Sequence, residues 1–165
     1  MELTSSEEFC RYFDRLRQRT LNVARCIPID KLEWSYRAGK WTFGDILRHL
    51  AALERWMWAE NVRGNPSRYT GCGPEIAADY GGTFQFLDTM HAESMAIFSK
   101  LTDADLRAKC ATPAGAPLET WKWLRAMAEH EAHHRGQLYT YLGMLDVPTP
   151  ALFGLTSEEV AERAG

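Results

Sequence analysis

With 165 residues, the chain suits one domain with one hydrophobic core, and we expect a single domain over residues 1–165. Hydrophobic residues make up 45% and charged residues 25%, which excludes an intrinsically disordered chain. The formal net charge is −3, and Lys and Arg form no concentrated stripe in the sequence. This argues against a nucleic-acid partner, because such a partner requires a basic patch.

The cysteines and the first residues indicate the compartment. Four cysteines include no C-x-x-C pair, so neither a zinc ribbon nor a redox dithiol is indicated: Cys10, Cys26, Cys72 and Cys110. The opening MELTSSEEFC is polar and acidic, unlike a signal peptide. No apolar run approaches the roughly 18 residues needed to span a bilayer. We expect a cytoplasmic protein with reduced thiols and no membrane partner.

Helical periodicity dominates the chain. A capping signal at Thr4-Ser5-Ser6-Glu7 begins the first helix, which ends by Pro28. No β-hairpin signal appears. Four long amphipathic helices and one short last helix are predicted, over residues 4–28, 42–63, 83–101 and 118–145 and from Thr156 onward.

Residues 64–82 hold five of the twelve glycines and are predicted to form a long loop between the second and third helices. Long loops within compact domains are often functional. The predicted fold class is therefore all-α, a four-helix bundle with a short C-terminal helix, and the long loop allows a crossover connection.

Three histidines are predicted to face the core. At about 100° per residue, His134 lies about 40° from His130 on one helix, within an apolar stripe. Trp123 and Tyr141 lie on the same side. His49 on the second helix shares its face with apolar residues and with two acids: Ile46, Leu53, Trp56, Asp45 and Glu60.

A lone histidine on an apolar face is usually an ordinary core residue, but two at i and i+4 can converge on one ion. A third on another helix strengthens this interpretation. Three neutral imidazoles leave coordination positions open, as in a catalytic site, and suit zinc, iron, nickel or copper. His91 lies near the apolar face of its helix and is a weaker ligand candidate, while His133 lies at the margin of the stripe.

The stretch His130-Glu131-Ala132-His133-His134 also matches the H-E-x-x-H motif of zinc proteases, in which the Glu is the general base. The metzincin extension requires a histidine where this chain has Thr140. Glu158 and Glu159 fit better in the first turn of a capped helix than as a third ligand. The protease interpretation is therefore disfavoured.

Two stretches resemble the DinB/YfiT-like superfamily of small four-helix metal proteins. These are WTFGDILRHL at residues 41–50 and HEAHHRGQ at residues 130–137, with weaker support from PALFGLT at residues 150–156. The resemblance covers nearly the whole chain. It implies a divalent metal ion (zinc, nickel or iron) held by His49, His130 and His134, the three histidines that the helical faces also select. His133 falls outside this pattern.

The resemblance also implies a choice of functions. Superfamily members include S-transferases and isomerases that use a low-molecular-weight thiol, which predicts a thiol S-transferase acting on a small electrophile. We expect its pocket to be lined by Trp56, Trp123 and Tyr141. The resemblance implies a homodimer and does not imply DNA binding.

Two alternatives stay open. The first is a metal-dependent hydrolase, in which Asp45, Glu60 or Glu131 would be the base that activates water. Asp45 could instead orient a ligand or cap its helix. The second is a metal or small-molecule binding module without catalytic activity.

Overall fold

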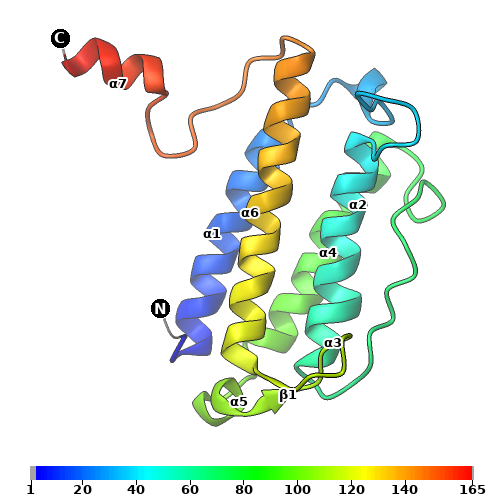
Figure 1. Ribbon diagram of the computed structural model, residues 1–165, viewed down its shortest axis with the longest axis vertical. Coiled ribbons are helices and arrows are strands. Elements are labelled where there is room, and N and C mark those ends of the chain that lie inside the picture. Colours follow the sequence, from blue (N-terminus) through cyan, green and yellow to red (C-terminus); the bar gives the residue numbers. More distant parts are fainter. Residues whose placement is uncertain (1–2, 165) are drawn as a thin grey trace.

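The computed structural model describes residues 3–164, which fold into an elongated helical bundle (Figure 1). Its long elements are consistent with the predicted fold class. They are α1 (Ser6–Ala24), α2 (Phe43–Leu53) with its continuation, α4 (Tyr80–Phe98) and α6 (Thr120–Met144). Shorter helices are η1 (Ile29–Lys31), α5 (Asp103–Arg107) and α7 (Ser157–Ala164).

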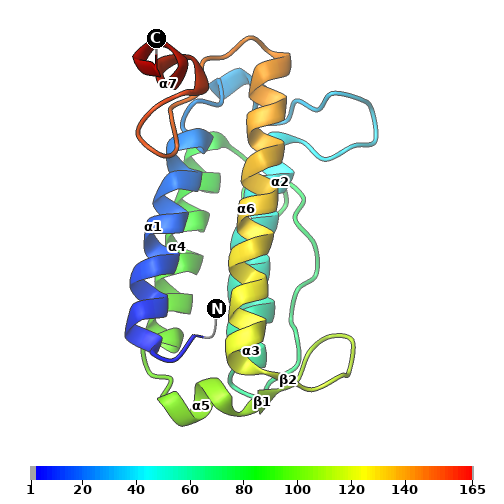
Figure 2. The same ribbon diagram turned by 60° about the vertical axis from the view of Figure 1, so that its left-hand side comes forward.

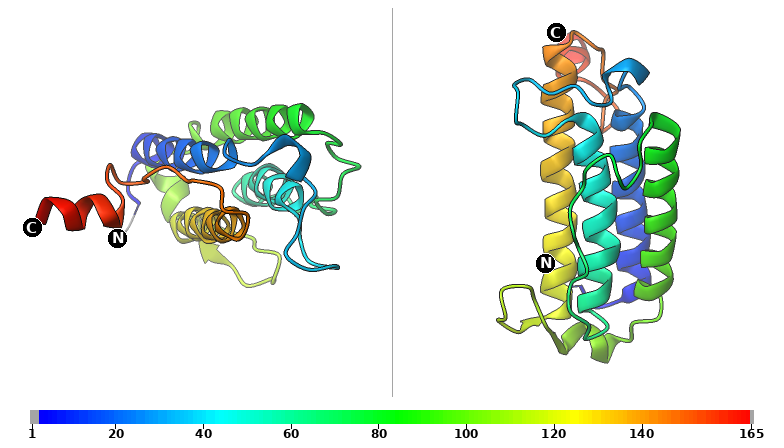
Figure 3. Two further views of the ribbon diagram at one scale, coloured as in Figure 1. Left: turned by 90° about the horizontal axis from the view of Figure 1, so that it is seen from above. Right: turned by 90° about the vertical axis from the view of Figure 1, so that its right-hand side faces the viewer.

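Seen end-on, the four long helices stand at the corners of a square (Figure 3). The main packing partners are α2 with α4 and α1 with α6. Because α2 and α4 run in the same direction, the chain between them returns along the whole bundle (Figures 1 and 2). The glycine-rich loop over 62–79 is this crossover connection. Among residues 3–164, no helix is long and apolar enough to cross a membrane.

Side-chain caps determine where the helices begin. The Ser5 hydroxyl accepts from the Glu8 amide at the start of α1, and Thr42 forms a capping box with Asp45 at the start of α2. Asp79 caps α4, so this helix begins at Tyr80 and ends at Phe98. The prediction of 83–101 was therefore three residues late, because two glycines inside the first turn of α4 resembled loop.

The second long helix is not a uniform α-helix. After α2, the five residues of η2 (Glu54–Trp58) form a π-helix, and α3 (Ala59–Asn61) completes the element. Hydrogen bonds in a π-helix join residues i and i+5. Residues beyond Leu53 are therefore rotated by about one residue, or 100°, from the face that a continuous α-helix would predict.

A two-residue antiparallel pair lies before α6, where no strand was predicted. Lys109 of β1 (Lys109–Cys110) is paired with Glu119 of β2 (Leu118–Glu119), so α6 begins at Thr120 rather than Leu118. Strands this short have no alternating hydrophobic pattern, so periodicity could not predict them.

The core consists of two hydrophobic clusters. One contains Phe43, Ile46 and Leu138, and the other contains Phe9, Phe98 and Leu124. Each cluster draws on several helices, so the packing of apolar side chains joins all four corners of the bundle.

A buried polar group links one residue from each of the four long elements. The Arg17 guanidinium donates to Glu54, and its Nη2 lies 2.8 Å from a carboxylate oxygen of Glu131. Nδ1 of His91 lies 2.9 Å from the other oxygen of Glu54. The side chains of Arg17, Glu54 and Glu131 are at most 2% exposed. Burial raises the pKa of Glu131, whereas the Arg17 charge acts in the opposite direction.

Replacing Arg17 by Met should destabilise the protein strongly, because two buried carboxylates would lose their cation. We expect the free energy of unfolding, measured with urea, to fall by about 3–5 kcal/mol. Arg11, whose side chain is 58% exposed in the same helix, is the matched control. Arg11→Met should change stability by less than about 0.5 kcal/mol. Equal stability of the two variants would contradict a structural role for the buried charges.

Candidate metal centre

Three imidazoles from two helices meet inside the bundle. His49 of α2 and His134 of α6 each place Nε2 beside Nε2 of His130, at 3.1 and 3.0 Å. These three side chains form a group that could hold a metal ion. The structure thus brings together the three histidines that the sequence selected.

The two contacts of His130 cannot both be ordinary hydrogen bonds. A ring nitrogen carries either one proton or one lone pair. Nε2 of His130 can therefore complete one linear hydrogen bond, to His49 or to His134, and leaves the other contact unsatisfied. A cation that accepts all three lone pairs would satisfy every Nε2 atom at once.

Two of the three nitrogen–nitrogen distances suit such a cation, and all three ligand atoms lie within 4.8 Å of one another. A zinc–nitrogen bond of 2.0–2.1 Å with tetrahedral angles places neighbouring ligand nitrogens about 3.3 Å apart. The 3.0 and 3.1 Å contacts of His130 are close to this value. The donor set and its geometry therefore fit a divalent metal held by three histidines.

Burial keeps the three rings neutral. His49 is 8% exposed and His134 is 6% exposed. Desolvation and the neighbouring His134 lower the pKa of His49 to about 4. Desolvation and the neighbouring imidazoles lower the pKa of His130 to about 3, and desolvation also lowers the pKa of His134. Neutral imidazole is the form that binds a metal, so protons do not compete with the ion near pH 7.

The outer nitrogens of two rings are held by neighbours. The Tyr69 hydroxyl lies 2.9 Å from Nδ1 of His49, and Oε1 of Gln137 accepts from Nδ1 of His134 at 2.6 Å. Such contacts fix the orientation and tautomer of a ligating imidazole. Gln137 follows His134 by three residues on the same helix, whereas nothing in the sequence of the long loop pointed to Tyr69.

Arg48 holds the crossover loop against α2 and so places Tyr69. Its Nε donates to the carbonyl of Cys72 at 2.8 Å, and Nη1 donates to the carbonyl of Ala77 at 3.1 Å. The same guanidinium is paired with Glu33 and Asp45. Arg48 is fully buried, so its charge depends on these partners.

Two tryptophans pack directly on the imidazoles. The Trp41 ring centroid lies 4.5 Å from that of His49 and 5.7 Å from that of His134, and Trp58 lies 4.9 Å from His130. Trp41 is 41% exposed and covers the centre from solvent. The π-helix places Trp58 here and turns Trp56 towards Phe86, at 5.5 Å.

The expected aromatic lining therefore needs correction. Trp56 does not pack on the three histidines, and the Trp123 ring packs at a tilt against Trp58, with 5.4 Å between the ring centroids. Tyr141 lines a neighbouring pocket of about 320 Å³ together with residues of the 36–41 loop. Trp41 and Gln137 also line this pocket, so it opens beside His134.

The other two histidines are placed elsewhere. His91 contacts Glu54, and its Nε2 lies 3.6 Å from Asp14, so it belongs to the buried charge group. His133 is exposed, although its ring centroid lies 5.0 Å from that of His134.

The three candidate bases are each engaged by other groups. Asp45 accepts from the Thr42 amide and from Arg48, and Glu131 is paired with Arg17. Burial would raise the pKa of Glu60, but hydrogen bonds from Arg55, Asn65 and Arg68 outweigh it and lower the pKa to about 2. Glu131 of the H-E-x-x-H match therefore belongs to the buried charge group with Arg17 of α1. This argues against a role for Glu131 as the general base of a protease.

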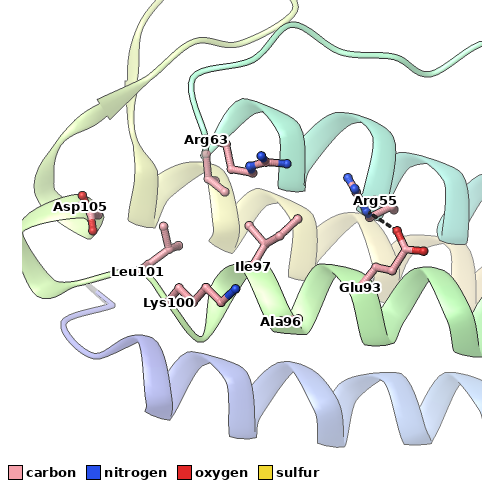
Figure 4. Close-up of a pocket in the computed structure, with 9 residues that line it drawn as sticks. Arg55, Arg63, Glu93, Ala96, Ile97, Lys100, Leu101 and Asp105 are labelled. Carbon is pink, nitrogen blue, oxygen red and sulfur yellow. Dashed lines mark hydrogen bonds and ion pairs between the residues drawn. The ribbon is translucent and has the colours of Figure 1, made fainter.

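A larger cavity of about 710 Å³ lies between the end of the second long element and α4 (Figure 4). An ion pair between Arg55 and Glu93, with 2.7 Å between Nε and Oε2, crosses one end of it. Arg63, Ile97 and Lys100 also line this cavity, and its lining includes neither the three clustered histidines nor the residues that contact them, such as Trp41 and Gln137. We therefore assign no role in metal chemistry to it.

Fold and site together define a class: a four-helix bundle with a three-histidine group that could hold a metal. The chain matches the family model of the DinB superfamily over residues 12–138, and it belongs to this superfamily. None of the curated proteins matches it.

Solved structures agree with this fold. A DinB-like protein from Bacillus subtilis matches with a TM-score of 0.71 and 18% identity, over 90% of this chain and 99% of the other. A protein described as a four-helix bundle protein matches with a TM-score of 0.64 and 24% identity, over 82% and 99%. A DinB-like protein from Bacillus cereus gives 0.62 and 20%, over 88% and 95%.

Removing the Tyr69 hydroxyl should weaken metal binding, because His49 would lose the contact that orients its ring. For Tyr69→Phe we expect the Kd for zinc, measured by competition with a chromogenic chelator, to rise by about 10–100-fold. Tyr80→Phe is the control, since Tyr80 packs on Phe84 at 4.7 Å at the start of α4. An unchanged Kd for Tyr69→Phe would show that this hydroxyl does not position the ligand.

Proposed function

We propose that this protein is a metal-dependent S-transferase that joins the sulfur of a low-molecular-weight thiol to a small electrophile. The observation that carries the proposal is the convergence of three neutral Nε2 atoms beside an accessible pocket. His49, His130 and His134 would hold the ion, with zinc, nickel or iron as the candidates. When bound, a divalent ion with three neutral ligands retains its +2 charge and lowers the pKa of a thiol that reaches it.

The surroundings of the site support thiol transfer over hydrolysis. A hydrolase in which a protein base activates water needs a free carboxylate, and the three candidate acids are occupied by arginines and a helix cap. Thiol transfer depends less on such a base, because the ordinary pKa of a thiol, about 8.5, already lies much closer to neutrality than that of water, about 15.7. The sulfur then bonds to the electrophilic carbon, and the leaving group departs with the electron pair of the broken bond.

The chain's own residues would supply binding and exclusion of water. The 320 Å³ pocket is lined by aromatic rings and by polar groups that suit a small polar substrate: Tyr36, Gly39, Lys40, Trp41, Gln137 and Tyr141. Trp41 lies between this pocket and the imidazoles of His49 and His134. We propose that Trp41 limits access of water to the centre while the 36–41 loop receives the substrate.

The proposal predicts thiol conjugation that depends on the three histidines. Protein loaded with zinc, nickel or iron is mixed with one of several cellular low-molecular-weight thiols and monochlorobimane, and fluorescence of the conjugate is recorded. With at least one thiol, we expect a rate at least tenfold above metal-free protein. His134→Ala should abolish this rate, whereas His133→Ala, one residue away and exposed, should retain it. Absence of a metal-dependent rate with every thiol would contradict the transferase assignment.

A further inference from the structure

The C-terminal arm ends in a helix that its own chain does not support. From Glu158 to Ala164 every side chain of α7 is exposed, including Val160 at 53%. The helix projects away from the bundle (Figures 1 and 3). Isolated helices shorter than about 12–15 residues are marginal in water, and α7 has eight residues. Contact with a partner surface would therefore stabilise it.

The base of the arm is fixed to the bundle beside α1. The Tyr139 hydroxyl of α6 donates to the carbonyl of Pro150. The Arg19 guanidinium lies 5.2 Å from the ring centroid of Phe153, which is 77% exposed. The arm thus leaves its own chain at a defined point and carries α7 outwards.

The α7 helix is acidic on one side and apolar on the other. Glu158 and Glu162 are one turn apart and share a side, and neither forms an ion pair within residues 3–164. Glu159 instead completes the cap with Thr156, at 2.7 and 3.2 Å. Val160 and Ala164 lie on the opposite side, so a partner surface should combine apolar contact with positive charge.

The outer face of α1 has this character. Arg11, Arg15 and Arg19 follow one another at steps of four residues and, with Tyr12 and Glu8, line a hollow of about 280 Å³ in which the arginines outnumber the single carboxylate. Arg11 is paired with Glu7 at 3.4 Å, whereas Arg15 and Arg19 have no carboxylate partner in the described part of the chain. Tyr12 is 46% exposed and offers an apolar surface beside this stripe. The spread of basic residues along the sequence did not predict such a stripe.

A buried arginine beside the stripe adds to the positive charge of this face. Arg135 of α6 is only 7% exposed, and among residues 3–164 it donates to the carbonyl of Leu16 at 3.4 Å and forms no ion pair. Burial lowers the pKa of Arg135, and although Glu131 acts in the opposite direction, the charge of Arg19 lowers it further. A nearly buried guanidinium without a carboxylate partner is unfavourable, and an acidic surface placed over it would stabilise it.

We propose that α7 of one chain docks on the basic face of α1 in a second copy, and that the second copy returns the same contact. We assign α7 to this basic face by charge complementarity. The carboxylates of Glu158 and Glu162 would lie against three cations: Arg15, Arg19 and Arg135. Within its own chain α7 projects away from the bundle (Figures 1 and 3). In a two-fold pair each arm would reach the α1 face of the other chain. The contact closes a dimer, because each chain has one arm and one basic face.

Charge reversal separates this dimer from its alternatives. One variant carries Glu158→Lys and Glu162→Lys, and the other carries Arg15→Glu and Arg19→Glu. Multi-angle light scattering after size-exclusion chromatography of the full chain should show a wild-type dimer whose Kd rises with salt. Each variant alone should be monomeric, with Kd raised at least tenfold. An equimolar mixture of the two should form a heterodimer, because both of its contacts then join opposite charges.

Controls make each result decisive. Glu75→Lys with Asp103→Lys changes the charge equally at exposed positions far along the chain and should leave the dimer intact. Circular dichroism verifies that all variants are folded. Recovery of a dimer in the mixture shows that each variant can still associate. A monomeric wild type, or a dimer that persists in both variants, would overturn the proposal. A mixture that stays monomeric would overturn it in favour of docking within one chain.

Discussion

Three imidazole rings meet inside the bundle in an arrangement in which hydrogen bonds alone cannot satisfy all three Nε2 atoms. Nε2 of His130 faces two other Nε2 atoms at 3.0 and 3.1 Å, but it can complete a linear bond with one of them. Desolvation holds all three rings in the neutral form, so added protons do not relieve the conflict near pH 7. A divalent cation at the meeting point relieves it entirely.

The rest of the bundle keeps these rings in place. The Arg17 group links one residue from each long element, and breaking it would leave charges without partners in the core. Arg48 fastens the crossover loop, which brings Tyr69 to His49. The π-helix turns Trp58 onto His130. Distant segments of the chain therefore cooperate to orient three ligands, as preorganised metal sites require.

The direction in which the three histidines face could be predicted because they lie in regular helices. The residues around them could not be predicted, because they lie in irregular segments. His130 and His134 are one turn apart in α6, and His49 lies before the π-helix, so an angle of 100° per residue places all three correctly. Beyond Leu53 the same angle fails, and Trp56 was assigned the place that Trp58 occupies. Tyr69 and Trp41 come from loops, where no periodicity relates sequence position to direction in space. The strand pair Lys109–Cys110 and Leu118–Glu119 is too short to have a pattern.

The central claim is that His49, His130 and His134 bind one divalent metal ion, and metal content tests it most directly. Freshly purified protein is analysed by inductively coupled plasma mass spectrometry, alongside His134→Ala and the adjacent, exposed His133→Ala. We expect one equivalent of metal per chain in wild type and His133→Ala, and a loss of at least tenfold in His134→Ala. Wild type without stoichiometric metal after incubation with zinc, nickel or iron, or equal loss in both variants, would contradict it.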